Sequence, residues 1–486
     1  MNVFWVCNAA ALSVTETAET PMSNFWDANV WGWMLLMGIL LGSLLVGNII
    51  KKSIPLLQQS LIPTSVLGGA ILLIVAAVYK LITGDVMFDT ALFNGNGTDN
   101  LEIITYHSLA LGFIASSFKT SGGRVTKQRS VEIFNTGVTT VSTYLLQAIF
   151  GMGITMAVAL FVPGFFQAAG VLLPFGYGQG TGQALNYGNI YEVEHGFAGG
   201  RSFGLTIAAL GFLSAAIGGV IHLMIVKRRG KLVRSSRRDG STQTDKVESY
   251  FEIPMQESMD KMTVQIALIV VAYAIVYALM AGLSALAPGL RSVIYGFNFL
   301  LGVIVATLMK ITMNLLRKKH VIRKKYTNNF LMTRTSNFFF DLMVVAGVAA
   351  IRLDQLESSW GVILILGAVG LVITYVYNRI VAKTLFPDYV EEQFLTMFGM
   401  LTGTASTGII LLREVDGDFK TPASDNMVYQ NFPAIVFGFP MMFLATLAPE
   451  KPVLTMIIFV LFFAVMNVIL FRSFIFKRRG KKKKDE

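Results

Sequence analysis

The chain has 486 residues, of which 54% are hydrophobic and only 14% are charged, and its mean hydropathy is +0.60. Soluble domains carry roughly a quarter charged residues, so this composition excludes an ordinary soluble enzyme and predicts a polytopic membrane protein. The formal net charge of +11 does not indicate a nucleic-acid partner, because the basic residues cluster at the ends of apolar segments. The single cysteine excludes a disulfide framework within the chain, and the four histidines lack HExxH spacing, which argues against a zinc site.

Residues 1–29 are predicted to form an extracytoplasmic tail. They contain Glu16, Glu19 and Asp27 but no Lys or Arg. A cleaved signal peptide would carry a basic region before its apolar stretch, so an uncleaved tail is the favoured interpretation, although small residues near position 10 resemble a cleavage site.

Apolar segments long enough to cross a membrane follow in chain order. A spanning helix needs about 20 mainly apolar residues. In the first half, residues 30–226, the predicted spans are 30–50, 62–82, 101–118, 133–162 and 203–226. In the second half, residues 262–447, they are 262–286, 292–313, 336–352, 359–382 and 426–447. An eleventh span at 453–475 lies within a last segment, 453–486, which ends in a basic tail.

The basic residues predict the orientation of these spans. With the N-terminus outside, nearly all of the 40 Lys and Arg residues fall in cytoplasmic segments, as the positive-inside rule requires. The polar stretch 227–261, which includes Arg237 and Arg238, is predicted to be a cytoplasmic linker between the halves. We therefore expect a multi-pass protein of the plasma or inner membrane with its C-terminus in the cytoplasm.

Two Gly- and Thr-rich segments, near 170–188 and 392–412, interrupt the two halves at corresponding places. Each lies between spans that end and begin on the same side, so each must enter and leave the membrane as a re-entrant hairpin. The first half crosses the membrane five times, an odd number, so the second half begins on the opposite side and runs in the opposite sense. Paired interruptions at corresponding places in two such halves mark transporter binding sites. The predicted fold class is an all-α polytopic membrane protein with two inverted five-helix repeats, each with a re-entrant hairpin, plus an eleventh helix.

The two hairpin tips have the chemistry of a solute and ion site. Glycine allows close approach of the backbone, helix N-termini attract carboxylates, and carbonyl and hydroxyl oxygens suit sodium. The predicted substrate-binding residues are Gly180, Thr181, Gly182, Gln183, Asn186, Gly403, Thr404, Ala405, Ser406 and Thr407. The predicted ion-binding residues are Thr181, Thr402, Thr404 and Asp341. Close helix packing through small residues would explain one motif alone, and the matched pair favours the binding site.

Other polar residues inside or beside the spans are further candidates, because burying them is costly. His107 could bind substrate or take a proton, with a packing role as the alternative. Arg201 could meet an anionic substrate or anchor the protein at the membrane interface. Gln430 and Asn431 could face a cavity where the tenth span is broken.

The chain resembles the bacterial sodium/glutamate symporter family. The stretch 178–182, Gly-Gln-Gly-Thr-Gly, is similar to the family's GHGTG, and 403–408, Gly-Thr-Ala-Ser-Thr-Gly, is similar to its GATPTA. Gln179 stands where the family has His, and Ser406 where it has Pro. The resemblance implies two inverted repeats, a homodimer in the lipid bilayer, and elevator-type symport of an acidic amino acid with sodium and no other cofactor.

The predicted function is therefore sodium-coupled symport of glutamate or a related acidic amino acid. The alternative is a proton- or sodium-coupled carrier of another carboxylate, or an exporter. An intramembrane enzyme would need paired catalytic groups, which the spans do not show, so no enzymatic activity is expected. A channel would need a filter motif repeated around an oligomer axis.

Overall fold

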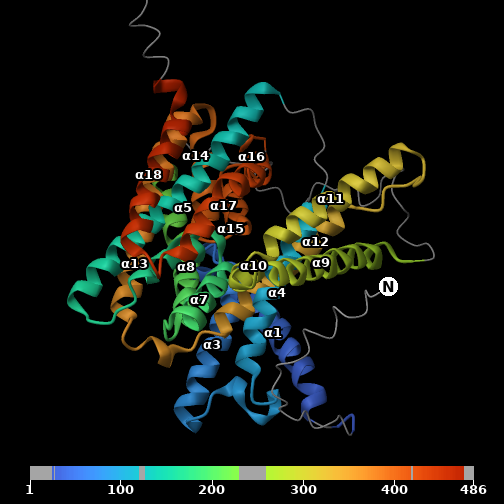
Figure 1. Ribbon diagram of the computed structural model, residues 1–486, viewed down its shortest axis with the longest axis vertical. Coiled ribbons are helices and arrows are strands. Elements are labelled where there is room, and N and C mark those ends of the chain that lie inside the picture. The colour runs from blue at the N-terminus through green and yellow to red at the C-terminus, as the bar shows by residue number, and fades with distance from the viewer. Residues whose placement is uncertain (1–23, 27, 120–125, 229–258, 418–419, 476–486) are drawn as a thin grey trace, which may run out of the picture.

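The computed structural model describes residues 24–26, 28–119, 126–228, 259–417 and 420–475, and within these ranges it is helical with no β-strand (Figure 1). Most of the N-terminal tail, most of the 227–261 linker and the end of the basic tail lie outside the described residues, so the predictions for them stay predictions.

The helices of the first half follow the predicted spans, with short segments between them. They are α1 (Ala28–Ser53), α2 (Pro55–Gln59), α3 (Thr64–Thr83), η1 (Met87–Asp89), η2 (Ala91–Phe93), α4 (Gly97–Ser117), α5 (Lys127–Phe161), η3 (Gln167–Val171), α6 (Leu172–Gln179), α7 (Thr181–His195) and α8 (Gly200–Arg228).

The second half has a similar succession of long helices and short segments. They are α9 (Lys261–Leu286), η4 (Pro288–Leu290), α10 (Arg291–Gly296), α11 (Asn298–Lys318), α12 (Asn329–Ala349), η5 (Leu353–Leu356), α13 (Trp360–Leu385), η6 (Pro387–Tyr389), α14 (Val390–Thr402), α15 (Ala405–Arg413), α16 (Ala423–Tyr429), α17 (Asn431–Leu447) and α18 (Pro452–Leu470).

Several helix ends are set by local residues that satisfy the first free N–H groups. The Asp260 carboxylate accepts hydrogen bonds from the backbone N–H groups of Met262 and Thr263 and so begins α9. The Asn328 side chain accepts from the N–H of Leu331 and begins α12.

Eight helices of the described chain are long and apolar enough to cross a membrane, namely α1, α3, α5, α8, α9, α11, α13 and α18. The pair α16 and α17, bent by 49°, would make a ninth span. The protein is thus a multi-pass helical membrane protein. The predicted spans 101–118 and 336–352 fall on α4 and α12, which are not among the eight. These two helices pack on each other and bury much of their surface, so they need not be apolar all round.

The helices form two groups that are each held together by their own contacts (Figure 1). We call the group of α1, α3, α4, α9, α11 and α12 the scaffold bundle, and the group of α5–α8 and α13–α18 the hairpin bundle. Each half of the chain contributes its first three predicted spans to the scaffold bundle and the rest to the hairpin bundle. The main contact between the bundles is made by α7, which packs against α4 and α12. The fold therefore places the first glycine-rich segment at the boundary between the bundles.

Candidate functional site

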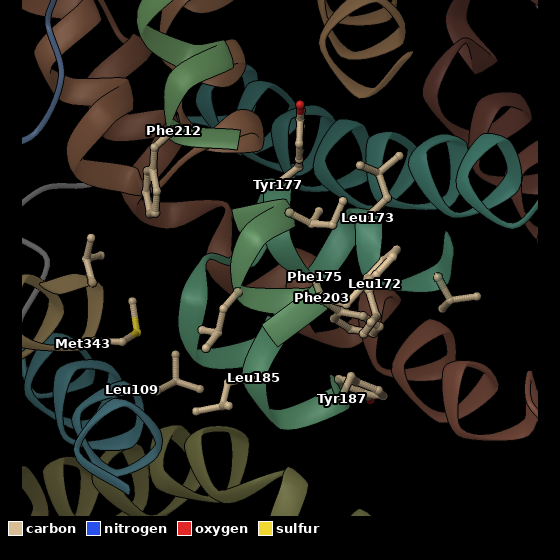
Figure 2. Close-up of a cluster of buried hydrophobic side chains, with 14 of the residues drawn as sticks. Leu109, Leu172, Leu173, Phe175, Tyr177, Leu185, Tyr187, Phe203, Phe212 and Met343 are labelled. Atoms are coloured by element: carbon tan, nitrogen blue, oxygen red, sulfur yellow. The ribbon is translucent and has the colours of Figure 1, made fainter. Parts of the chain in front are cut away.

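The first glycine-rich segment folds back on itself. α6 ends at Gln179, and Gly180, with φ +80° and ψ −171°, connects it to α7. The rings of Phe175 and Tyr187, on opposite sides of this break, stack with centroids 3.8 Å apart. Figure 2 shows the cluster of buried hydrophobic side chains to which Phe175 and Tyr187 belong. We call this helix pair the first hairpin.

The second glycine-rich segment has the same helix–break–helix form. α14 ends at Thr402, and Thr404 caps α15, its Oγ1 accepting a hydrogen bond from the backbone N–H of Thr407 at 3.5 Å. The two helices are in close contact, because a Cβ added to Gly399 would lie 2.9 Å from the Cα of Gly408. We call this pair the second hairpin.

The two breaks touch each other. A Cβ added to Gly180 would lie 3.6 Å from Cγ2 of Thr404 and 3.9 Å from the carbonyl oxygen of Gly403. The N-termini of α7 and α15 and the C-termini of α6 and α14 therefore converge on one small region. The free N–H groups at the N-termini of α7 and α15 favour anions, and the free carbonyl groups at the C-termini of α6 and α14 favour cations.

The residues selected from the sequence differ in accessibility at this meeting point. Thr181, Gln183 and Thr402 are almost completely buried, whereas Ser406 is exposed and Thr404 is half-buried. The Thr181 hydroxyl donates to the carbonyl oxygen of Met343 on α12, at 3.2 Å. The first hairpin tip is thus enclosed by the scaffold bundle, and the second exposes the first turn of α15.

Gln183 has a buried N–H donor without an acceptor. Asn186 Nδ2 donates to the backbone carbonyl of Gly296, which can only accept, so the orientation of the Asn186 amide is determined. The same Nδ2 donates to Gln183 Oε1 at 3.3 Å, which makes the other atom of the Gln183 amide its nitrogen. Gln183 Nε2 is buried and has no partner. A buried donor without an acceptor lowers the stability of the folded protein by about 1–3 kcal/mol, unless a ligand accepts its hydrogen bond.

Two of the other candidates lie away from the hairpin tips. Asp341 is exposed on α12 and lies beside Ser65 of α3, whereas Met343 of the same helix faces Thr181. His107 is also exposed, and its Nδ1 is 2.7 Å from the hydroxyl of Tyr273 within the scaffold bundle.

The two candidates at the broken tenth span lie within the hairpin bundle. Gln430 is buried and its Oε1 accepts from the hydroxyl of Thr140, while its Nε2 donates to Asn431. Asn431 is exposed. They flank the bend between α16 and α17, and Gln430 Nε2 also donates to the sulfur of Met400 on α14, at 3.5 Å.

Arg201, at the start of α8, is held by acidic partners. Its Nη1 is 3.0 Å from Oε2 of Glu102 on α4, and its Nε is 2.9 Å from Oδ1 of Asn189 and 3.8 Å from Oε1 of Glu192. The pair with Glu102 joins the hairpin bundle to the scaffold bundle. The structure therefore gives Arg201 a structural role that does not require a substrate.

We expect Arg201→Ala to destabilise the protein without weakening substrate binding. The ion pair with Glu102 is partly exposed, so its loss should cost on the order of 1 kcal/mol or more, between the values for surface and buried pairs. The thermal unfolding midpoint of the purified variant would measure the first effect, and its affinity for acidic amino acids, the substrate class expected from the sequence, would measure the second. A large loss of affinity at unchanged stability would instead assign Arg201 to the substrate.

Sequence analysis did not select four buried polar residues of the hairpin bundle. Thr143 and Gln147 lie on α5, and Thr374 and Asn378 lie on α13. The available signal was their spacing of four residues inside apolar spans, which places each pair on one face of its helix.

Two helix bundles with two helix breaks that meet between them are an arrangement typical of secondary transporters. Residues 33–392 match the family model described as sodium/glutamate symporter, and the chain belongs to this family. The family match includes the first hairpin and ends within α14, so the rest of the second hairpin lies beyond it. No curated protein matches the chain.

Proposed function

We propose that this protein carries glutamate or a related acidic amino acid across the membrane together with sodium, by an elevator-type movement. The family membership supports sodium-coupled glutamate transport. The observation that carries the proposal is the contact between the two helix breaks, together with the unpaired amide nitrogen of Gln183 in the first turn of α7.

The hairpins supply both kinds of ligand that such a carrier needs. The N–H groups at the starts of α7 and α15, with Gln183 Nε2, would bind substrate carboxylates. The carbonyl groups at the ends of α6 and α14, with the hydroxyls of Thr402 and Thr404, would bind sodium. Asp341, which lies on another face of α12, is not part of this proposed ion site.

The division into two bundles supports the elevator movement. The hairpin bundle would move and the scaffold bundle would form the contact of a homodimer in the bilayer. The boundary at α7 includes apolar contacts: a Cβ added to Gly182 would lie 2.9 Å from Leu109 of α4 and from Met343 of α12. Apolar contacts have no fixed partners and can slide, whereas the hydrogen bond from Thr181 to Met343 and the ion pair of Arg201 with Glu102 would have to break during the movement.

The inverted repeats remain part of the proposal, with boundaries at 30–226 and 262–447 around the 227–261 linker and the extra segment 453–486. In this arrangement the first hairpin enters from outside and the second, near 392–412, from the cytoplasm. The N-terminus would then be extracytoplasmic and the C-terminus cytoplasmic, as the basic residues favour.

The test replaces the unpaired donor of the first hairpin. Gln183→Leu should weaken glutamate binding by about 10- to 100-fold, because a hydrogen bond to a charged group contributes about 1.5–3 kcal/mol. Sodium-driven uptake of labelled glutamate into proteoliposomes and direct binding to the purified protein would measure this effect.

The matched control is Gln265→Leu in the scaffold bundle. Gln265 is also buried, but its amide donates to the carbonyl groups of Lys261 and Tyr326 and accepts from the N–H of Asn328. This variant should lose stability but keep the glutamate affinity. Unchanged affinity in Gln183→Leu would refute the assigned role, and uptake driven by a proton gradient without sodium would favour the alternative, proton-coupled carrier.

A further inference from the structure

A polar cluster lies inside the hairpin bundle, between α5 and α13 and beside the end of α14. It consists of the side chains of Thr143, Gln147, Thr374 and Asn378 and the backbone carbonyl of Leu401. None of the four side-chain residues exposes more than 1% of its surface. Buried polar atoms in such a place are expected to have hydrogen-bond partners.

The hydrogen bonds of this cluster determine the orientation of both amides. Gln147 Nε2 donates to the Leu401 carbonyl at 3.0 Å and to the Thr374 hydroxyl at 2.8 Å. Asn378 Nδ2 donates to the backbone carbonyl of Thr374 at 2.9 Å and is 3.4 Å from the hydroxyl of Thr143. A carbonyl group only accepts, so neither amide can be turned around without placing two acceptors against each other.

Two amide oxygens are left without donors as a result. Gln147 Oε1 and Asn378 Oδ1 are both buried, and neither has a hydrogen-bond partner. Both amides bond to the same residue, Thr374, so they belong to one cluster. Leaving two buried acceptors without donors is unfavourable, and a bound cation would remove this cost.

The donor set indicates which cation would bind. The cluster offers amide, hydroxyl and carbonyl oxygens and has no carboxylate, whereas calcium and magnesium sites use carboxylates. Leu401 lies in the last turn of α14, where free carbonyl groups carry the negative end of the helix dipole. Neutral oxygens and a half-helix C-terminus are the ligands that transporters use for sodium.

We propose that Gln147, Asn378, Thr374 and Thr143 form a sodium site between α5 and α13, separate from the ion-binding residues at the hairpin tips. The proposal rests on the proposed sodium-coupled function and adds a second sodium site to the one proposed at the hairpin tips. Sodium bound here would tie α14 to α5 and α13 one residue before Thr402. It would thereby hold the second hairpin in the shape that presents Thr404 and the start of α15 to the substrate. Because coupling is reciprocal, substrate would raise the affinity for sodium by the same factor.

The test measures sodium binding to the full-length protein without substrate, by calorimetry and by thermal stabilisation in sodium chloride against choline chloride. Asn378→Leu and Gln147→Met each remove one unpaired oxygen. Each should raise the sodium concentration for half-saturation at least about tenfold, as loss of groups around a metal commonly does. Gln147→Met keeps the size and helix propensity of glutamine, so it should fold even if Asn378→Leu does not.

The control variant is Asn467→Leu on α18, in the same bundle. Asn467 has a fully bonded amide, since its Oδ1 accepts from the hydroxyl of Tyr377 and its Nδ2 donates to the carbonyl of Phe463. Its sodium affinity should equal that of the wild type. At saturating sodium, Gln147→Met should also recover the wild-type affinity for glutamate.

The outcomes separate the two proposals. Wild-type sodium affinity in Gln147→Met, in a protein that still shows sodium-driven glutamate uptake, would overturn the site between α5 and α13 and leave the proposed function intact. Glutamate binding and uptake that do not depend on sodium in the wild type would overturn the proposed function itself.

Discussion

Replacing Gly180 with alanine should abolish sodium-driven glutamate uptake while leaving a folded protein. Gly180 has φ +80° and ψ −171°, a region that only glycine adopts readily, and an alanine there would store about 1–3 kcal/mol of strain. The backbone would relax by moving the first hairpin tip, which touches Thr404 and the carbonyl of Gly403. The helix N-termini that are proposed to bind the substrate would then lose their alignment. Uptake into proteoliposomes measures this loss.

Gly196→Ala is the control for this variant. Gly196 also has a positive φ, +70°, at the end of α7, and an added Cβ would meet nothing within 4 Å. Alanine in this left-handed conformation costs about 1–2 kcal/mol, so the two variants should lose similar stability. Only Gly180→Ala should lose transport. Equal uptake in both variants would show that the contact between the hairpin tips is not required.

Replacing Gly151 with valine should prevent the hairpin bundle from assembling. α5 crosses η3 at this point, and a Cβ added to Gly151 would lie 2.2 Å from the carbonyl oxygen of Gly170. The crossing is also held by Thr155, whose Oγ1 donates to the carbonyl of Gln167 and accepts from the N–H of Gly170. Overpacking costs about 1–3 kcal/mol where neighbours can yield, and backbone atoms cannot, so the loss should reach or exceed this range.

Gly153→Val, two residues along the same helix, is the matched control. A Cβ on Gly153 would meet only Cε of Met456, at 3.7 Å, which is ordinary contact. Both variants carry the same change in helix propensity, so the difference between them reports the crossing alone. Size-exclusion profiles and thermal midpoints in detergent would compare them. Comparable profiles for the two variants would show that α5 and η3 can separate.

The spans show what hydropathy can and cannot predict. Long apolar helices such as α5 and α13 leave much of their surface uncovered by other helices. Such a surface must be apolar to lie in a membrane, so composition identifies these helices. The predicted spans that correspond to α4 and α12 are less apolar, and both contain charged residues, such as Glu102 and Asp341. A helix that packs against other helices exposes less surface to lipid, so it need not be apolar on every side. A search by hydropathy alone therefore misses such helices.

The candidate site was predicted in part. The glycine and threonine motifs identified the two helix breaks, because glycine and hydroxyl residues are unusual inside apolar segments. Their contact, at Gly180 and Thr404, follows from the packing of both halves into one bundle. The position of Asp341 on the face of α12 beside Ser65 could not be read from the sequence, since burial inside a span does not say which neighbour a residue faces.

The sequence alone determined that this is a helical membrane protein of the sodium/glutamate symporter family, because composition and local motifs depend only on residues close together in the chain. Only the tertiary structure decided which polar groups are left without partners. Gln147 and Asn378 are 231 residues apart in the sequence, and both bond to Thr374. Whether a buried amide is satisfied depends on contacts between distant segments, which the packing of the helices creates.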